Sequence, residues 1–140
     1  MNSPDTRSTL EVFQDHLQKR LSGDVEEEIS QNYARDIVVL SNHGTFRGHA
    51  GLKQSAGILD RLLPNAKLKY TCKLTEGEVA FLEWIGASGD KQVRDGTDTF
   101  LIRDGKILVQ TIHYTVCLSE KQALEQAGRK LEPADKTEDH

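Results

Sequence analysis

The sequence is poor in cysteine, tryptophan and proline. Its two cysteines, Cys72 and Cys117, stand far apart, with no Cys-x-x-Cys or Cys/His spacing. Disulfide frameworks and zinc sites need clustered or regularly spaced cysteines, so neither is predicted, and we interpret both cysteines as buried apolar residues. No His-x-His run and no pair of histidines four residues apart occurs either. We therefore expect no metal and no cofactor.

Long apolar runs and an excess of positive charge are also missing. The longest apolar runs, such as residues 37–40, fall far short of the roughly 20 residues that cross a bilayer. A formal net charge of −4 gives no general attraction for nucleic-acid phosphates or anionic lipid. The first residues are polar and include Asp5, unlike the basic and then apolar start of a secretory signal. The sequence thus predicts a cytoplasmic protein that binds neither nucleic acid nor membrane.

The chain of 140 residues is long enough for one domain, and its first half predicts three helices. Ser8 and Glu11 form a capping box before an apolar stripe, which predicts a helix over residues 9–22. Asp24 and Glu27 repeat the capping pattern and predict a second, shorter helix. A third helix is predicted after a loop that contains Gly44, Gly48 and Gly51; its apolar stripe is Leu52, Ala56, Leu59 and Leu63, and Pro64 ends it.

The second half of the chain alternates apolar and polar residues, as strands with one wet face do. Glu76-Gly77 and Asp104-Gly105 lie between such runs and predict hairpins within a four-stranded meander. With a short strand over residues 37–40, the result is an α+β domain over residues 9–118, in which three N-terminal helices pack on a curved, mostly antiparallel sheet and form a cone with a pocket. We expect residues 1–8 to form an arm and residues 119–140 a polar, partly disordered tail.

Two motifs and the order of the elements point to a known family. Gly44-x-x-Arg47-Gly48 precedes the third helix, and Gly96-Thr97-Asp98-Thr99-Phe100 leads to Asp104-Gly105-Lys106-Ile107. Over about residues 10–116 the chain thereby resembles the SnoaL-like branch of the nuclear transport factor 2-like superfamily. The resemblance implies the cone-shaped, cystatin-like fold of that superfamily. It leaves the function open, since enzymes, ligand binders and association modules share such a scaffold.

Ketosteroid isomerase is a relative whose site allows a comparison residue by residue. It uses an aspartate base, with a tyrosine and a protonated aspartic acid as oxyanion donors. Aligned without gaps, Asp98 falls at the oxyanion acid, His16 at the tyrosine and Ser41 at the base. A serine cannot take a carbon-bound proton as a carboxylate does, so steroid isomerisation is not expected. Of the Asp-Arg-Asp set of limonene epoxide hydrolase only Asp98 is matched. The SnoaL-like polyketide cyclases, which use an acidic residue as acid and base, remain the nearest analogy.

Asp98 and His113 are the first candidate pair for chemistry. Counting back from a two-residue turn at Asp104 and Gly105 puts Asp98 opposite Thr111. Asp98 and His113 are then diagonal neighbours on the inward face, about 7–8 Å apart between backbones. The pair is either the polar centre of a functional pocket or a structural hydrogen bond of the core.

Glu83 and His16 complete the set of candidate catalytic residues. The same counting from the turn at residues 76 and 77 sets Glu83 opposite Tyr70 on the inward face. A carboxyl group there needs a partner or a raised pKa, and Tyr70 or a histidine could simply satisfy it. His16 lies at the edge of the apolar stripe of the first helix, where it could line the pocket. The other side chains expected to line the pocket are Ser41, Tyr70, Phe81, Phe100, Val109 and Thr111.

Two functions compete on this sequence. Carboxylates and imidazoles around an apolar pocket favour a cofactor-independent isomerase, cyclase or hydrolase that uses general acid–base chemistry on a small apolar molecule. The departures from the catalytic sets of the relatives favour a non-catalytic module that binds a ligand or another chain. A homodimer is predicted in either case, because Leu82 and Trp84 are expected on the outer sheet face beside lysines 67, 69 and 73.

Overall fold

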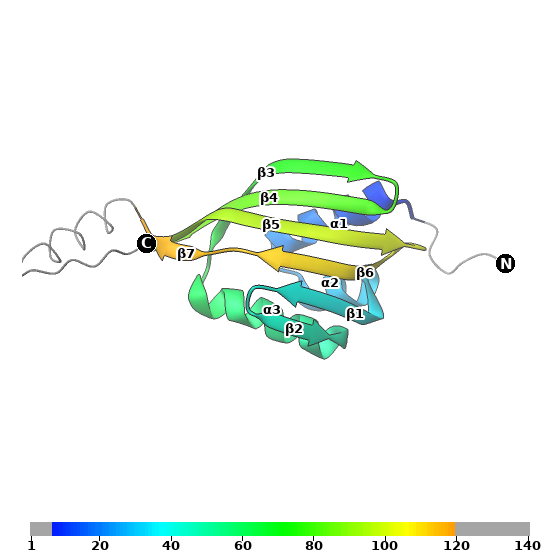
Figure 1. Ribbon diagram of the computed structural model, residues 1–140, viewed down its shortest axis with the longest axis horizontal. Helices are drawn as coiled ribbons and strands as arrows, with labels where there is room; N and C mark the ends of the chain where they lie inside the picture. The colour runs from blue at the N-terminus through cyan, green and yellow to red at the C-terminus, as the bar shows by residue number, and fades with distance from the viewer. Residues whose placement is uncertain (1–6, 120–140) are drawn as a thin grey trace, which may run out of the picture.

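The fold is described from a computed structural model, and the structure describes residues 7–119. Within these residues the chain forms three helices and seven strands, in the order shown in Figure 1. The helices are α1 (Thr9–Ser22), α2 (Val25–Asn32) and α3 (Gly48–Leu62). The strands are β1 (Tyr33–Ser41), β2 (Gly44–Arg47), β3 (Lys67–Glu76), β4 (Val79–Ser88), β5 (Lys91–Arg103), β6 (Lys106–His113) and β7 (Val116–Leu118).

Helix α1 forms as the sequence predicts. The Ser8 side chain accepts a hydrogen bond from the backbone N–H of Glu11, whose carboxylate accepts one from the backbone N–H of Ser8. The helix ends at Gly23, which has a left-handed φ of 82°. Helix α2 differs from its prediction, because the Asp24 side chain makes no capping hydrogen bond. Helix α2 ends at Asn32, and the next residue, Tyr33, is the first residue of β1.

The loop predicted over residues 44–51 is largely ordered secondary structure. Residues 44–47 fold back on β1 as the short strand β2, with Ser41 paired to Gly44 and Val38 to Arg47. Helix α3 begins at once with Gly48, whose φ of 72° allows the chain to turn from the strand into the helix. Two of the three glycines therefore lie within the helix, where Gly51 lets the backbone of Phe46 approach closely.

One mixed sheet holds all the strands in the order β2-β1-β6-β5-β4-β3, and β7 pairs with β5. The predicted four-stranded meander is β3 to β6, and β1 joins its edge parallel to β6. The three helices pack on one face, with α1 behind β3 to β5 and α3 along β1 (Figure 1). The α+β architecture with three N-terminal helices on a mostly antiparallel sheet is thus confirmed.

Three one-residue bulges interrupt the strand pairing. Thr71 of β3 and Leu108 of β6 each have no partner, and β5 has one residue more than β4 between the pairs Trp84–Gly96 and Gly86–Val93. A bulge reverses which side chains face inward beyond it and increases the local twist. These bulges decide which residues reach the interior.

The core lies between the helices and the inner face of the sheet. Its fully buried side chains include Val12 and Phe13 of α1, Ile37 of β1 and Phe100 of β5.

No helix within residues 7–119 is long and apolar enough to cross a membrane. The predicted tail lies outside the described residues except for Ser119, and so does the predicted arm except for Arg7 and Ser8.

Candidate functional site

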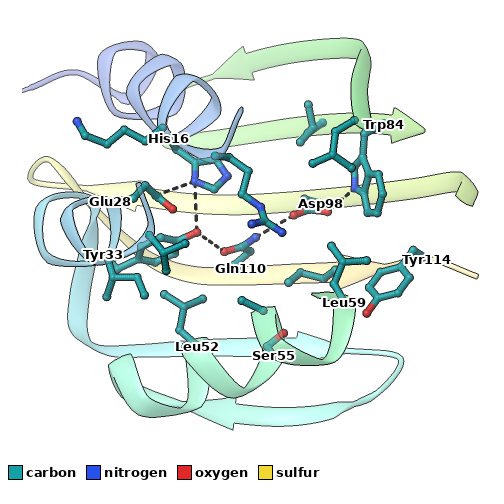
Figure 2. Close-up of a pocket in the computed structure, with 18 of the residues that line it drawn as sticks. His16, Glu28, Tyr33, Leu52, Ser55, Leu59, Trp84, Asp98, Gln110 and Tyr114 are labelled. Atoms are coloured by element: carbon teal, nitrogen blue, oxygen red, sulfur yellow. Dashed lines mark hydrogen bonds and ion pairs between the residues drawn. The ribbon is translucent and has the colours of Figure 1, made fainter. Parts of the chain in front are cut away.

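A cavity of about 90 Å³ lies between the helices and the inner face of the sheet (Figure 2). This volume is several times the 10–15 Å³ or so that a single water needs by a comparable measure. Most of the wall is apolar, and polar side chains gather on the sheet and on α1. The lining residues are His16, Lys19, Arg20, Val25, Glu28, Ile29, Tyr33, Leu52, Ser55, Ala56, Leu59, Leu68, Tyr70, Leu82, Trp84, Asp98, Gln110, Ile112 and Tyr114.

His16 of α1 and Glu28 of α2 form a buried pair at one end of the cavity. Nδ1 of His16 lies 2.8 Å from Oε2 of Glu28, and Nδ2 of Asn32 donates to the same oxygen at 3.3 Å. With Glu28 as the acceptor, Nδ1 carries the ring proton and Nε2 the lone pair. Nε2 makes no hydrogen bond within residues 7–119. Every fully buried side-chain nitrogen or oxygen of these residues has a hydrogen-bond partner, so Nε2 is not fully buried. Nε2 therefore reaches the cavity.

A chain of hydrogen bonds continues from this pair across the sheet (Figure 2). The hydroxyl of Tyr33 lies 3.4 Å from Nδ1 of His16 and donates to Oε1 of Gln110 at 2.7 Å. Nε2 of Gln110 donates to Oδ2 of Asp98 at 2.8 Å, and Nε1 of Trp84 donates to Oδ1 at 2.9 Å. Both carboxyl oxygens of Asp98 are thus engaged by donors on neighbouring strands.

Burial changes the acidity of the groups in this wall. It raises the pKa of the Asp98 carboxyl group, and the hydrogen bonds from Trp84 and Gln110 oppose that rise. It also raises the pKa of Tyr70 to about 12 and that of Tyr33 well above its ordinary value. Both tyrosines are therefore neutral phenols near pH 7. Tyr70 uses its proton to donate to the carbonyl oxygen of Leu17 at 3.1 Å.

Two cations from the end of α1 also line the cavity. Lys19 donates to Oδ1 of Asp15 at 2.8 Å, so its charge is paired one helical turn away. Arg20 is half-buried and makes no hydrogen bond or ion pair with any residue in the described part of the chain. The cavity wall therefore holds one guanidinium group whose donors are uncommitted.

The structure brings three of the predicted site residues to this wall. His16, Tyr70 and Asp98 all line the cavity. Phe100 faces inward but lies in the core, where its ring packs at 5.0 Å from that of His16 and 5.5 Å from that of Phe13. Phe100 thus packs against the ring of His16 from the core and does not line the cavity.

His113, Val109 and Thr111 are not part of the site. The turn after Arg103 is as predicted, but the bulge at Leu108 makes Asp98 pair with Ile112 instead of Thr111. Beyond that bulge Gln110 and Ile112 take the inward positions, and Val109, Thr111 and His113 face outward. The side chain of His113 is 55% exposed and lies 3.6 Å from Asp95. The predicted contact between Asp98 and His113 is therefore wrong.

Glu83, Phe81 and Ser41 also lie away from the cavity. The β3–β4 turn falls one residue later than predicted, with Glu76 paired to Val79, and Glu83 lies opposite Cys72. Because of the bulge at Thr71, Cys72 and Glu83 face outward while Tyr70 and Trp84 face inward, so Glu83 is exposed. Phe81 shares this outward face, whereas Leu82 and Trp84 are buried inside. The prediction that placed them on the outer face is wrong for the same reason. The hydroxyl of Ser41 accepts a hydrogen bond from the backbone N–H of His43 at the β1–β2 turn.

Several polar residues of the cavity wall are not predicted from the sequence. For two of them, the position on a helix face indicates that the side chain points inward. Glu28 lies three residues after Val25 and directly before Ile29, on the apolar side of α2. Arg20 follows His16 by four residues, so both share one face of α1. Gln110 gave no such signal, because its inward position depends on the bulge at Leu108.

Among residues 7–119, no group of three or more histidine, cysteine, aspartate or glutamate side chains could hold a metal ion. Cys72 and Cys117 are free and half-buried, less buried than the sequence suggested.

Comparison with known proteins supports the fold. No protein-family model matches the sequence, and neither does any curated protein sequence. Solved structures match well in shape at low identity. A provisionally assigned ketosteroid isomerase from Kribbella flavida is 15% identical, with a TM-score of 0.65 over 94% of this chain and 91% of its own. A nuclear transport factor 2-like protein of unknown function from Burkholderia xenovorans is 15% identical, with a TM-score of 0.64 over 93% and 95%.

A third structure, a provisionally assigned SnoaL-like polyketide cyclase from Mesorhizobium loti, is 14% identical. Its TM-score is 0.59 over 77% of this chain and all of its own. The chain therefore has the fold of the nuclear transport factor 2-like proteins, and its structural neighbours include relatives of ketosteroid isomerase and of the polyketide cyclases.

Proposed function

We propose that this chain, with its nuclear transport factor 2-like fold, binds a small and mainly apolar molecule in the cavity and acts on it by general acid–base chemistry. The reaction is of the isomerase, cyclase or hydrolase type and needs no cofactor. One observation carries the proposal: the buried His16–Glu28 pair, whose Nε2 atom faces an otherwise largely apolar cavity. An imidazole oriented by a carboxylate is a suitable base near neutral pH.

His16 is the proton acceptor in this proposal. Its Nε2 takes a proton from a C–H or O–H group of the ligand, and the imidazolium that forms is stabilised by the Glu28 carboxylate at Nδ1. The same imidazolium returns the proton to another ligand atom, which completes an isomerisation or a ring closure. Tyr33 and Tyr70 are poor bases, because their raised pKa keeps them protonated.

Asp98 has a positioning role in this proposal. Its two oxygens accept hydrogen bonds from Trp84 and Gln110, which fixes both side chains in the cavity wall. Through Gln110 it also fixes the hydroxyl of Tyr33, which lies beside the His16 ring. Asp98 thus fixes the side chains of the cavity wall that lie across from His16.

Exchange of carbon-bound protons tests the proposal directly. Small cyclic ketones are incubated with the protein in D₂O, and loss of their α-proton signals is followed by NMR. We expect exchange with the wild-type protein and a decrease of about 10²–10⁴-fold in His16→Gln, the usual contribution of a positioned acid–base group. His113→Gln is the matched control, because that histidine is exposed and outside the cavity. An equal loss in both variants would contradict the role of His16.

Non-catalytic ligand binding is the alternative. It is favoured by the polar chain from Glu28 to Trp84, in which nearly every group already has a partner, as in a structural network. The fluorescence of Trp84, which lines the cavity and is the single tryptophan of the chain, separates the two functions. Ketones that change this fluorescence without any exchange would establish the binding protein. Ketones that do neither would overturn both functions.

A further inference from the structure

Arg20 lies in the wall of the cavity beside the proposed base, His16. It stands four residues after His16 on α1, so both side chains leave the same face of the helix, with Cβ atoms about 5–6 Å apart. Most of the other lining side chains are apolar, including Leu52, Leu59 and Leu82. A cation is thus set at the wall of a largely apolar cavity, next to the proposed base.

The other charged groups that line the cavity already have partners. Lys19 is paired with Asp15, and His16 with Glu28. Both oxygens of Asp98 accept hydrogen bonds, from Trp84 and Gln110. Within residues 7–119, Arg20 alone among these charged groups has neither an ion pair nor a hydrogen bond. Partial burial of a guanidinium is costly when its five N–H donors have no acceptor from the protein.

We infer that the ligand of this cavity is an apolar molecule with a carboxylate group, which Arg20 binds through paired N–H···O hydrogen bonds. The inference rests on the proposed function, because it names the class of ligand for the same cavity. The planar guanidinium fits a carboxylate through two parallel hydrogen bonds. The apolar wall takes the hydrocarbon part of the ligand, and the carbon atoms next to the carboxylate then lie near Nε2 of His16.

The electrostatic effect of Arg20 agrees with this position. Its positive charge lowers the pKa of Asp98, Tyr33, Tyr70 and Tyr114, although burial outweighs that effect at each group. Three of these residues lie on different strands of the sheet and Tyr114 lies between β6 and β7, and all four line the cavity. The field of Arg20 therefore reaches across the cavity, and it offsets the repulsion that an ionised Asp98 would exert on a ligand carboxylate.

Matched acids and amides test the inference through the fluorescence of Trp84. The probes are hexanoate with hexanamide, and cyclohexanecarboxylate with its amide. In the wild-type protein we expect each acid to bind at least about tenfold more tightly than its amide, as charge-assisted hydrogen bonds allow. In Arg20→Met the acids should lose that advantage while the amides keep their affinity. Arg20→Lys, which keeps the charge but not the paired geometry, should retain only part of it.

Arg61→Met is the matched control, because Arg61 is an exposed arginine in the last turn of α3 and does not line the cavity. It should leave both affinities unchanged. Circular dichroism checks the fold of each variant, and Arg20→Gln replaces Arg20→Met if the latter does not fold. Amides that bind as tightly as acids would overturn the inference and leave the proposed function standing. Probes that all fail to bind would overturn the proposed function itself.

Discussion

Gly96 lies directly beneath the indole ring of Trp84. A Cβ atom added at Gly96 would lie 2.3 Å from two ring carbons of Trp84 and 2.7 Å from its Nε1. We expect Gly96→Ala to push the indole away, break its hydrogen bond to Asp98, and lower the free energy of unfolding by about 1–3 kcal/mol, as overpacking in a core does. Urea denaturation gives the stability, and the emission maximum of Trp84 reports the displaced ring.

Gly57 provides the control for that substitution. It lies in α3, and an added Cβ would meet only the end of the Arg61 side chain, at an ordinary 3.8 Å. Gly57→Ala should therefore raise the free energy of unfolding by about 0.5–1 kcal/mol, since alanine favours a helix over glycine. If both substitutions shift stability in the same direction, the close packing of Gly96 against Trp84 is not the cause.

Asp98 should make stability depend on pH. Burial raises its pKa in the folded protein, so the native state binds more protons than the unfolded state between the ordinary and the raised pKa. The contribution of Asp98 to the free energy of unfolding therefore falls as pH rises through that interval. Asparagine does not titrate, so the stability of Asp98→Asn relative to wild type should increase with pH over the same interval.

Urea denaturation of both proteins at a series of pH values measures this difference. A difference that stays constant from roughly pH 3 to pH 8 would show that folding leaves the acidity of Asp98 unchanged. A difference that decreases with pH would show that hydrogen bonds from Trp84 and Gln110 outweigh burial at this carboxyl group.

At the scale of elements, helices and turns could be predicted from the sequence more fully than strand registers. The limits of α1 follow from local signals, the capping box at Ser8 and the glycine at position 23. The side chains that face inward from β4 and β6 depend on bulges at Thr71 and Leu108, and no local pattern marks either. Such a shift of one residue exchanges the two faces of a strand.

The errors in the candidate site follow from these shifts. Glu83 and His113 were expected inside and are exposed, and Trp84 was expected outside and is buried. Asp98 kept its inward position because the bulge in β6 lies on the opposite strand. His16 was expected on the cavity side from helical periodicity alone, which a bulge in the sheet does not affect.

At the scale of the whole molecule, the outer face of the sheet presents apolar rows. One row consists of Val79, Leu101, Val109 and Val38 on four adjacent strands, and the next includes Leu74, Phe81 and Leu40. Val79 is 45% exposed and Leu74 60%. We expect a homodimer through this face, because monomers seldom leave such a contiguous apolar surface in water. Light scattering should give twice the 15.7 kDa mass of the chain.

Leu101→Lys should convert the dimer to a monomer, because it places a charge in the middle of these rows. Leu21→Lys adds the same charge at an exposed leucine on α1, away from the sheet, and should leave the mass at the dimer value. A wild-type mass of a single chain at micromolar concentration would contradict the expectation, and so would dissociation by both variants.

The parallel pairing of β1 with β6 has a consequence for biosynthesis. Ser41 ends β1 and Lys106 begins β6, and the hydrogen bond from Tyr33 to Gln110 joins residues that are 77 positions apart. Translation at 5–20 residues per second puts roughly 3–13 s between the two strands. During that delay β1 has no β6 to pair with, and the sheet that buries side chains such as Ile37 and Val39 is incomplete. The nascent chain is then exposed to chaperones and to aggregation, and the cavity is completed only when β6 leaves the ribosome.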